Sequence, residues 1–547
     1  MGAGTAHWPS WSLRVESAMR LIDYLDKGAA LGPDAPCLTM GERDISYADV
    51  QRVTWRVARA LQRAGVKPGD KVAILSSNDP IAFACVFSIS RVGAVWCPIN
   101  PRNEAAENRF ILDAFDCTSL IFHSAYAPLV EQMRADLPKL SLLVCLDKPM
   151  SFAPALDAWL DGVGDDPFEV AAADDIAMIA GTGGTTGQPK GVMLSGRNLE
   201  TMSALTLMSY PFEGRPVYLA LAPLTHAAGV LCFPILALGG RVVIMRKADL
   251  TEFLDLIERR RVTHTFLPPT LIYMLLENPS LAATDRSSLQ CFWYGAAPIS
   301  VTRLEEAIDK IGPVMAQLFG QTEAPMMIST MAPRDHFTPD GTIARQRLAS
   351  AGKPTPLTQL AVMDDNGRLL PRGDRGEIVV RGSLVMEGYY KNPKATEEVT
   401  RFGWHHTGDI GYLDEQNFLY IVDRAKDMII TGGFNVYSIE VEQALLQHPD
   451  VMDSAVFGLP DAKWGERVAA VVQVHAGRSL SAEELIHFVK GRIGSVKAPK
   501  QVDIWPDLPR SKVGKVLKKE IRAKVLSREK DAGLDGDSER ERDLKRR

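Results

Sequence analysis

The chain has 547 residues, of which 46% are hydrophobic, so it carries enough apolar material for roughly three to four domain-sized cores. A formal net charge of −5 provides no general electrostatic reason to bind nucleic acid, and we expect no such partner. Seven cysteines, an odd number without a CxxC pair, indicate a reducing compartment and no structural metal.

Targeting signals are weak in this sequence. The N-terminal stretch MGAGTAHWPSWSLRVESAMR lacks an apolar core after a basic start, which argues against a secretory signal. The longest strongly apolar segment, 230–238, contains Pro234 and is too short to cross a bilayer. We therefore expect a cytoplasmic protein without transmembrane segments. Peripheral membrane contact and the choice between monomer and homodimer stay open.

Two stretches alternate between β-rich runs and helical patterns. Between 71 and 146 the runs KVAILS, AVWCPI, SLIFH and SLLVCL alternate with helical patterns such as 81–92. Between 217 and 319 the runs VYLAL, RVVIM, THTFLP, LQCFWYG and VMAQLFG alternate with helical patterns such as 250–259. Such alternation is typical of βαβ units, so we predict two layered α/β subdomains.

The pattern changes near residue 350. Short strands with Gly, Pro and Asp turns follow, which indicate a small β-barrel or meander, and after Arg424 a compact α+β pattern begins. The end of the chain is dense in charge and poor in large apolar residues, as in disordered tails. We predict an α/β fold: a large N-terminal domain (1–424) of two α/β subdomains plus a small β-barrel, a small mobile α+β C-terminal domain (425–526), and a charged tail (527–547).

The segment GTGGTTGQPKGV, at 181–192, has the composition of a phosphate-binding loop. Its glycines let backbone N–H groups approach phosphate oxygens, its threonines add hydroxyl donors, and Lys190 adds positive charge. The spacing fits neither the Walker pattern nor GxGxxG, and a flexible Gly/Thr turn is the plain alternative. The candidate ligands are Thr182, Gly183, Gly184, Thr185, Thr186, Gly187 and Lys190.

Further polar residues follow predicted strands. In FGQTEA, Phe319 can stack on a purine, Thr322 can bond a phosphate oxygen and Glu323 can hold Mg²⁺, although a buried Phe and a helix cap explain the same letters. Asp409 is expected in a Gly-flanked turn, where it can bind ribose hydroxyls or form an ordinary Asx-turn.

Basic residues occur at the predicted domain junction and near the C-terminal end. Arg424 can reach phosphate or ribose, and Lys426 is either a hinge or an exposed charge. Lys515 follows Gly514 at a predicted turn, for which a basic surface loop is the alternative.

Together and in this order, these segments resemble the acyl-adenylate-forming superfamily of acyl-CoA synthetases, luciferases and peptide-synthetase adenylation domains. The resemblance covers residues 45 to 521 and includes SYADVQR and GLPDAKWGERVAAVV. It implies ATP-dependent activation of a hydrophobic carboxylic acid to an acyl-adenylate, with Mg²⁺, followed by transfer of the acyl group to coenzyme A. The small-molecule partners would be the acid, ATP and CoA.

The resemblance also implies roles for individual residues. The glycine-threonine loop and Lys190 would hold the β- and γ-phosphates, although Gly183 stands where serine is commoner. Catalytic roles fall to Lys515, Glu323 and Thr322, with Glu323 as the metal ligand and Lys515 bridging carboxylate and α-phosphate. The other implied nucleotide contacts are Gly295, Ala296, Ala297, Phe319, Gly320, Asp409 and Arg424.

The second half-reaction, in this resemblance, requires the small domain to rotate. Lys426 matches the hinge, and Gly432 and Gly433 match a tunnel for pantetheine. His226, Gly295 and Met326 would lie in the acyl pocket, for which small residues and nearby methionines favour a fatty, aryl or alicyclic acid. A lone His in an apolar run is, however, also a common core residue.

Alternative functions differ in the acyl acceptor. The segment LAPLTHAAGV supplies no acid for a substrate amino group, which disfavours amino acids. Loading of a carrier-protein pantetheine and luciferase-like oxidation share the adenylation motifs and stay open, although the peroxisomal Ser-Lys-Leu ending is absent. A protein that only binds nucleotide is disfavoured by the presence of both Glu323 and Lys515.

Overall fold

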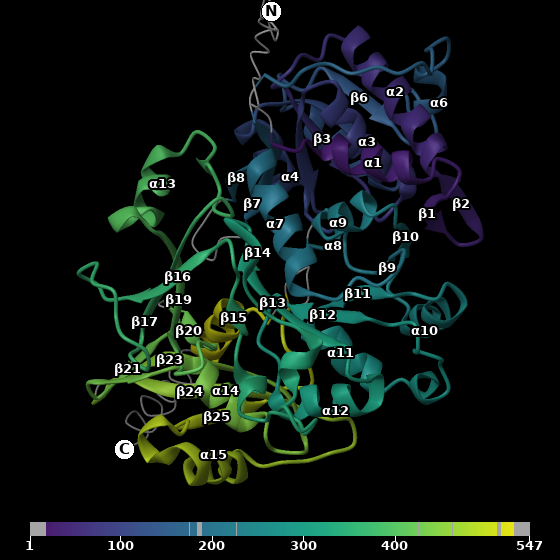
Figure 1. Cartoon of the computed structure of the whole chain (residues 1–547). Coiled ribbons are helices and arrows are strands. Elements are labelled where there is room, and N and C mark those ends of the chain that lie inside the picture. Colours follow the sequence, from purple (N-terminus) through teal and green to yellow (C-terminus); the bar gives the residue numbers. More distant parts are fainter. Residues whose placement is uncertain are drawn as a thin grey trace, which may run out of the picture.

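The computed structural model describes residues 18–173, 175–182, 189–225, 227–424, 426–461, 463–510 and 516–529. Two large mixed sheets and a small antiparallel sheet form the main body, and the C-terminal unit packs at one end of it (Figure 1). Several predicted residues lie outside the described ranges: Gly183, Gly184, Thr185, Thr186, Gly187, His226, Lys515 and most of the 527–547 tail.

The first sheet has seven strands in the order β18-β8-β7-β4-β3-β5-β6. The pairs from β7 to β6 are parallel, whereas β8 and β18 add antiparallel strands at one edge. Its strands are β3 (Lys71–Leu75), β4 (Val95–Ile99), β5 (Cys117–Phe122), β6 (Leu142–Cys145), β7 (Ile176–Thr182), β8 (Lys190–Ser195) and β18 (Gly388–Tyr389). The accompanying helices are α2 (Tyr47–Arg63), α3 (Pro80–Arg91), α4 (Ala105–Ala114), α5 (Ala127–Arg134) and α6 (Leu156–Trp159).

Helix α3 illustrates how local sequence and packing agree. Asp79 caps its N-terminus by accepting hydrogen bonds from the N–H groups of Ile81 and Ala82, and Pro80 occupies the first turn, where no N–H is needed. The helix is apolar around almost its whole circumference and almost entirely buried. It contacts α1 (Leu21–Leu31) and α2 as well as strands, so it has no solvent face.

The second sheet has nine strands in the order β15-β14-β13-β12-β11-β9-β10-β1-β2. Its strands are β1 (Pro36–Met40), β2 (Arg43–Ser46), β9 (Val217–Ala220), β10 (Arg241–Ile244), β11 (His264–Leu267), β12 (Cys291–Gly295), β13 (Met315–Gln321), β14 (Ala324–Met331) and β15 (Lys353–Pro354). Its helices are α7 (Gly196–Ser209), α8 (Ala227–Val230), α9 (Cys232–Ala237), α10 (Leu250–Arg259), α11 (Pro269–Leu276) and α12 (Val301–Ile311). The predicted second subdomain is therefore extended by β1 and β2, which come from the start of the chain.

One continuous apolar core joins the two large sheets. It includes Val72 of β3, Phe87 of α3, Tyr218 of β9 and Trp293 of β12, each no more than 2% exposed. Burial of such side chains contributes roughly 1.5–3 kcal/mol each, so this shared core holds the two subdomains as one body.

The segment after residue 350 forms an open sheet and not the predicted β-barrel. Its order is β16-β17-β19-β20, with all pairs antiparallel, and the edge strands β16 and β20 do not pair with each other in the described residues. The strands are β16 (Gln359–Met363), β17 (Gly376–Arg381), β19 (His405–Leu413) and β20 (Leu419–Arg424), with α13 (Pro393–Val399) nearby. Four strands are too few to close with ordinary twist and tilt, so the meander remains open.

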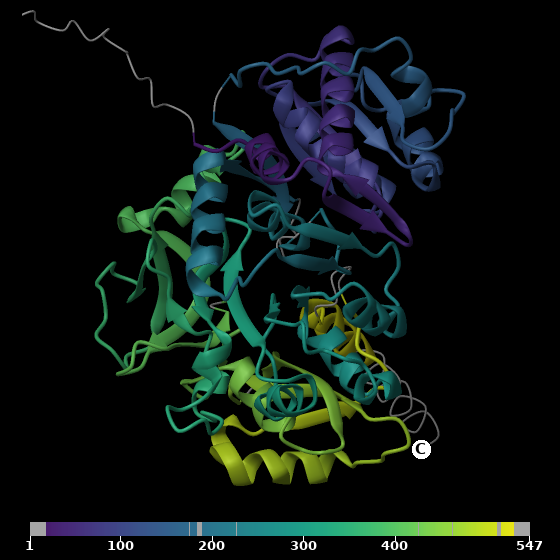
Figure 2. The same cartoon turned by 45° about the vertical axis from the view of Figure 1, so that its right-hand side comes forward.

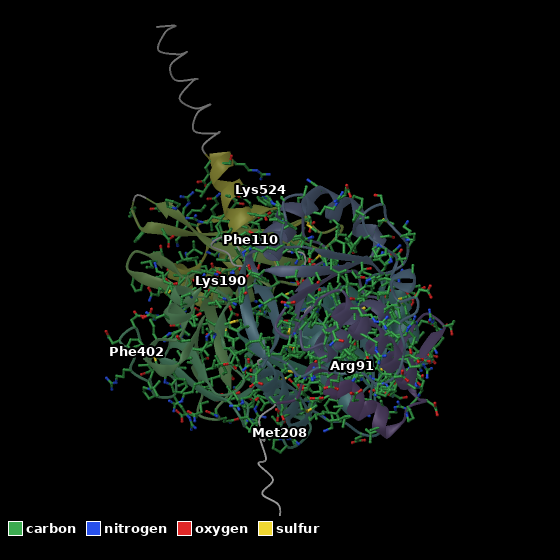
Figure 3. The ribbon with its side chains drawn as sticks, turned by 90° about the horizontal axis from the view of Figure 1, so that it is seen from above. Arg91, Phe110, Lys190, Met208, Phe402 and Lys524 are labelled. Carbon is green, nitrogen blue, oxygen red and sulfur yellow. The ribbon has the colours of Figure 1, made fainter. Side chains whose placement is uncertain are left out.

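The C-terminal unit has the predicted α+β composition and packs against the large body from below (Figure 2). Its strands are β21 (Ile429–Thr431), β22 (Phe434–Val436), β23 (Val451–Asp461), β24 (Gly465–Val474) and β25 (Gln501–Ile504), and its helices are α14 (Ser438–Leu445) and α15 (Ala482–Lys497). The view from above shows Met208 and Phe402 at the rim of the molecule and Lys190 over its body (Figure 3).

Candidate active site

The described ends of the glycine-threonine loop belong to a β-hairpin. Strands β7 and β8 pair antiparallel, with Thr182 opposite Lys190, so residues 183–188 connect two strand ends. Gly191 is required next to Lys190 because a Cβ there would approach Phe115 Cε1 to 2.7 Å. The prediction that the segment follows a strand agrees with the structure, and the following element is a second strand.

Lys190, at the loop end of this hairpin, contacts an aromatic ring. Its Nζ lies 4.7 Å from the ring centroid of Tyr389, in a cation–π contact, and the Tyr389 hydroxyl donates a 2.7 Å hydrogen bond to Glu323 Oε1. Burial and the neighbouring Glu323 charge raise the pKa of Tyr389, so its phenol stays protonated and acts as the donor. The structure thus joins two predicted residues through Tyr389, which no sequence motif singled out.

Glu323 is positioned by a tight connection between β13 and β14. A Cβ on Gly320 would lie 2.3 Å from the backbone nitrogen of Met326, and Met326 itself has a φ of +56°, unusual for a side chain of its size. The β13–β14 register is irregular at Phe319. This compact hairpin presents Thr322 and Glu323 at its tip.

The predicted adenine segment lies beside this hairpin. Gly295 ends β12 opposite Leu318 of the parallel neighbour β13, and a Cβ on Gly295 would approach the Leu318 carbonyl oxygen to 2.4 Å. Ala296 follows with a φ of +67°. The ends of β12 and β13 therefore bring 295–297 next to Phe319, as expected for ligand sites at the carboxyl ends of parallel strands.

Asp409 does not occupy the predicted turn. It lies within β19, directly opposite Arg424 of β20, and Arg424 Nε is 2.6 Å from Asp409 Oδ1. The flanking glycines suggested a turn, but β19 continues through them with a register shift between Ile410 and Gly411. The Asp409 side chain is 5% exposed and that of Arg424 is 43% exposed, so the pair links a buried carboxylate to the surface.

Gln321 connects the tip of the β13–β14 hairpin to β19. Its Nε2 donates to the carbonyl oxygen of Thr407 at 3.1 Å, and its Oε1 lies 2.9 Å from His405 Nε2. Since the amide oxygen can only accept, His405 donates from Nε2. Burial lowers the pKa of His405 to about 4, so this imidazole is neutral near neutral pH. In the sequence, Gln321 and His405 were only parts of motifs and carried no predicted role.

The proposed hinge and tunnel residues lie on the C-terminal side of the site. Lys426 is exposed in a turn just after β20. Gly432 and Gly433 form the turn between β21 and β22, both with positive φ. A Cβ on Gly432 would approach Trp464 Cε3 to 2.7 Å, whereas one on Gly433 would meet no atom within 4 Å.

Arg510, which precedes the Lys515 segment, contacts both the large body and the C-terminal unit. Arg510 pairs with Val516 in an antiparallel bridge, and its guanidinium reaches Thr270 Oγ1 at 3.4 Å and Asp453 at 2.8 Å. Thr270 lies at the start of α11, just beyond β11. Arg510 therefore lies close to the strand-end face of the second sheet.

A largely buried ionic cluster lies three residues further along. Lys518 Nζ is 2.7 Å from Glu442 Oε1 and donates to Ser438 Oγ at 2.6 Å, while Ser438 donates to Asp423 of β20. Burial raises the pKa of both Glu442, to about 7, and Asp423. The cluster ties the last strand of the large body to the C-terminal unit.

A magnesium ion at this site would depend on substrate oxygens. Among the described residues, no three His, Cys, Asp or Glu side chains gather closely enough to hold a metal by themselves. Mg²⁺ commonly takes one or two carboxylates together with phosphate oxygens, and Glu323 fits that donor set beside the phosphate-binding hairpin. The residues present thus fit a metal that arrives with nucleotide.

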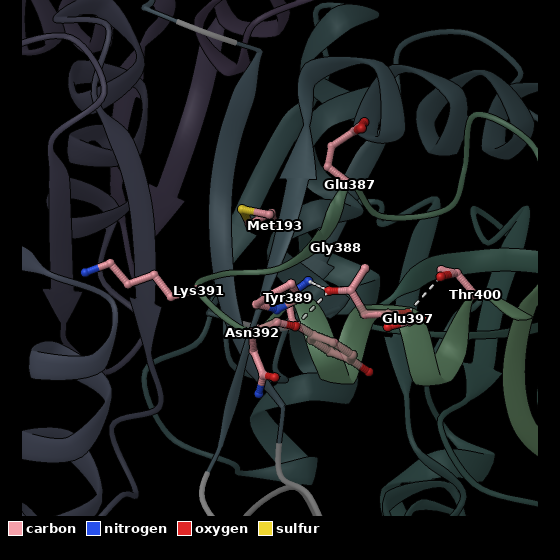
Figure 4. Close-up of a pocket in the computed structure, with 10 residues that line it drawn as sticks. Met193, Glu387, Gly388, Tyr389, Lys391, Asn392, Glu397 and Thr400 are labelled. Atoms are coloured by element: carbon pink, nitrogen blue, oxygen red, sulfur yellow. Dashed lines mark hydrogen bonds between the residues drawn. The ribbon is translucent and has the colours of Figure 1, made fainter.

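An open hollow of about 500 Å³ lies along β18 on the outer side of this region (Figure 4). It is lined by Met193, Glu387, Gly388, Tyr389, Lys391, Asn392, Pro393, Thr396, Glu397 and Thr400. Neither Gly295 nor Met326, which is 7% exposed, belongs to this lining, and the acyl-pocket assignment stays a prediction. Across the described residues, every helix is too short or too polar to cross a membrane.

Comparison with known proteins defines the class. The chain matches the AMP-binding enzyme model over residues 25–390 and the AMP-binding enzyme C-terminal domain model over residues 440–515. It therefore belongs to the AMP-binding enzyme family, which confirms the resemblance to adenylate-forming enzymes and the prediction of a ligase.

Individual relatives span several substrates. The chain is 35% identical to a medium/long-chain-fatty-acid–CoA ligase, FadD8, of Mycobacterium tuberculosis, covering 89% of this chain and 87% of the relative. It is 34% identical to a feruloyl-CoA synthase of Amycolatopsis sp, covering 90% and 96%. Among solved structures, the amide bond synthetase McbA from Marinactinospora thermotolerans superposes with a TM-score of 0.83 at 31% identity, covering 92% and 99%.

Proposed function

We propose that this enzyme activates a hydrophobic carboxylic acid with ATP and then transfers the acyl group to coenzyme A. The observation that carries this proposal is a chain of contacts: Tyr389 joins Lys190 to Glu323, and Gln321 joins the same β13–β14 tip to β19, the strand that carries Asp409 opposite Arg424. The chain belongs to the AMP-binding enzyme family, and several of its relatives are named CoA ligases or synthetases, which supports the same reaction.

In the first step, a carboxylate oxygen attacks the α-phosphorus, the bond to the bridging oxygen breaks, and pyrophosphate leaves with its electron pair. A carboxylate is already nucleophilic at neutral pH, so the site needs cations and donors more than a general base. We assign Lys190 and the loop threonines to the departing phosphates and Thr322 to the α-phosphate. Magnesium held by Glu323 would supply positive charge to the phosphates, and Lys515 would bridge the carboxylate and α-phosphate.

The nucleoside would occupy the opposite end of the site. We assign the adenine to the segment Gly295–Ala297 and Phe319, where β12 and β13 end side by side. Asp409 would accept hydrogen bonds from the ribose hydroxyls, with Arg424 facing the same sugar. Gln321, bonded to both His405 and Thr407, would keep the phosphate end and the ribose end at constant separation.

In the second step, the thiol of coenzyme A loses its proton to solvent and its sulfur attacks the acyl carbonyl. The bond from the acyl carbon to the phosphate oxygen breaks, and AMP leaves with that electron pair. We assign the described arrangement to the first step: Arg510, ahead of the Lys515 segment, contacts Thr270 of the large body, while Phe434 and Trp464, beside Gly432, are 61% and 45% exposed. Rotation about Lys426 would exchange these two surfaces. The domain division at residue 424 is thus also the proposed line of movement.

The experiment measures pyrophosphate release with medium-chain, long-chain and aromatic acids, each with and without CoA. The expected result is acid-dependent release and an acyl-CoA product with CoA present. No release with any acid would contradict the proposal. Release without acyl-CoA formation would instead indicate a carrier protein or, as in the name of the relative McbA, an amine as acceptor.

A further inference from the structure

Tyr389 contacts both Lys190 and Glu323 in the described part of the chain. Its hydroxyl donates to Glu323 Oε1 at 2.7 Å, and its ring face lies 4.7 Å from Lys190 Nζ. Tyr389 is 6% exposed, whereas Lys190 and Glu323 are partly exposed. Figure 4 shows Tyr389 on β18 among the residues that line the open hollow.

The backbone around Tyr389 holds the ring in place from both sides. Strand β18 pairs with β8, with Tyr389 opposite Val192, two residues after Lys190. The N–H of Met386 donates to the Glu323 carbonyl oxygen at 2.8 Å, and the N–H of Tyr389 donates to Thr396 Oγ1 at 2.9 Å. The segment 386–389 is thus bonded to the strand of Lys190 and to Glu323 itself.

We infer that Tyr389 is a positioning residue that holds the Glu323 carboxylate and the Lys190 ammonium apart, ready for the metal and the phosphates of the nucleotide. This inference rests on the proposed function. Opposite charges attract, and a direct Lys190–Glu323 ion pair would occupy both groups that the substrate needs. In the described residues these two groups make no ion pair, and Tyr389 contacts each of them instead.

The two contacts have different chemical requirements, so they can be separated by mutation. Tyr389→Phe keeps the ring under Lys190 and removes only the hydroxyl that restrains Glu323. A hydrogen bond to a charged group is worth about tenfold or more in an equilibrium constant. Tyr389→Leu removes the ring as well, and with it the cation–π contact.

The chain supplies a matched control in the next residue. Tyr390 is also bonded through its hydroxyl to a carboxylate, Asp116, at 2.7 Å, and its ring lies near Lys71 and Lys391 instead of Lys190. Tyr390→Phe therefore removes the same kind of bond from the same segment without touching Glu323. General loosening of β18 would affect both variants alike.

The test combines binding with kinetics. Mn²⁺ binding to the full chain, in the presence of a non-hydrolysable ATP analogue, is followed by electron paramagnetic resonance. We expect Tyr389→Phe to weaken Mn²⁺ binding about tenfold and to raise the Mg²⁺ concentration for half-maximal pyrophosphate exchange in parallel. The KM for the acid and the unfolding temperature should remain those of the wild type.

A double-mutant cycle separates positioning from a structural effect. In a Glu323→Gln background, Tyr389→Phe should cause no further loss of Mn²⁺ affinity, because the carboxylate it restrains is gone. Unchanged Mn²⁺ affinity in Tyr389→Phe, or an equal loss in Tyr390→Phe, would overturn the inference. If the wild type releases no pyrophosphate with any acid, the proposed function fails, while the Mn²⁺ titrations still decide whether Tyr389 acts on Glu323.

Discussion

At the scale of single residues, close backbone approach explains why two glycines stand in the candidate site. Gly295 and Gly320 both have backbone conformations open to other residues, but a Cβ on either would collide with main-chain atoms of the adjoining strand or hairpin. These two positions therefore require a residue without a Cβ, which lets the ends of β12, β13 and β14 come together. The consequence is that one methyl group can displace Thr322 and Glu323.

Gly320→Ala tests this directly. The added Cβ would lie 2.3 Å from the Met326 nitrogen, so the hairpin must shift, and overpacking of this kind costs about 1–3 kcal/mol. We expect pyrophosphate exchange to fall at least about a hundredfold, since misplacement of reacting groups by about 1 Å has effects of that order. Gly491→Ala, in α15 with open space around it, is the control and should retain wild-type exchange. Wild-type activity in Gly320→Ala would contradict the packing argument.

At the scale of elements, the β21–β22 hairpin places one closely packed glycine and one open glycine beside exposed apolar side chains. Gly432 faces the Trp464 ring, whereas Gly433 faces open space, and both have positive φ. Ile430, Phe434 and Trp464 leave an exposed apolar surface around this turn, with Ile430 at 53% and Phe434 at 61% exposure. Such a surface is consistent with an element that meets another part of the molecule or a substrate during the reaction cycle.

Substitution of Gly433 should separate the two half-reactions. A Cβ at Gly433 would meet no atom within 4 Å in the described arrangement. Gly433→Leu should therefore retain acid-dependent pyrophosphate exchange within about threefold. The positive φ at this position adds a local backbone strain of about 1 kcal/mol. Thioester formation should be lost if this turn lines the thiol path. Single-turnover assays with presynthesised acyl-adenylate measure that step. Parallel loss of both steps would argue against the assignment.

At the scale of the whole molecule, polar contacts join the large body to the C-terminal unit. Arg510 reaches Thr270, Arg303 Nη2 lies 3.2 Å from His475 Nε2, and the Lys518 cluster ties α14 to Asp423 at the end of β20. These contacts, between described residues, are polar, unlike the continuous apolar core within the large body. Polar interfaces between domains are typical of units that move relative to each other.

Lys515 tests the two-position scheme. With Lys515→Ala we expect loss of acid-dependent pyrophosphate exchange by at least two orders of magnitude, the effect of about 2.7–4 kcal/mol typical of a lost transition-state donor. Conversion of presynthesised acyl-adenylate to acyl-CoA should continue, because that step would use the other arrangement. Equal loss of both activities would refute the role of Lys515.

Buried histidines make the large body sensitive to acid. His264, His336 and His405 are at most 3% exposed, and burial lowers the pKa of each to about 4. Since an unfolded histidine has a pKa of about 6.5, the unfolded chain binds more protons between pH 6.5 and 4. The stability that these neutral rings contribute is thus complete above pH 6.5 and is lost as the pH falls through about 4.

Calorimetric unfolding between pH 7.5 and 4.5 checks the direction in which stability changes with pH. We expect the unfolding temperature to fall with decreasing pH, with a contribution of about 3 kcal/mol from each buried histidine at the acid limit. His336→Gln should reduce the dependence on pH, whereas His487→Gln, at an exposed position, should leave it unchanged. An unfolding temperature that rises on acidification would contradict the prediction.

Much of the architecture could be predicted because its signals are local. The alternation of apolar runs and amphipathic segments predicts both α/β subdomains, and the apolar run ahead of Phe319 correctly indicates that the motif from Phe319 to Glu323 lies at a strand end. The prediction of a turn at Asp409 was wrong because its glycines carry a local turn signal, which pairing with β20 overrides. The predicted barrel was inferred from a series of short strands. Which of these strands pair, and whether the sheet closes, is not determined by residues close together in the sequence.

The sequence by itself determined the family, the candidate nucleotide residues and the order of the units, because each depends on residues close together in the chain. Only the tertiary structure decided that β1 and β2 complete a sheet formed by strands some two hundred residues further on, and that Tyr389 lies between Lys190 and Glu323. Such contacts follow from the packing of whole sheets against one shared core. No single segment contains the information for them, since their energy is summed over partners distant in sequence.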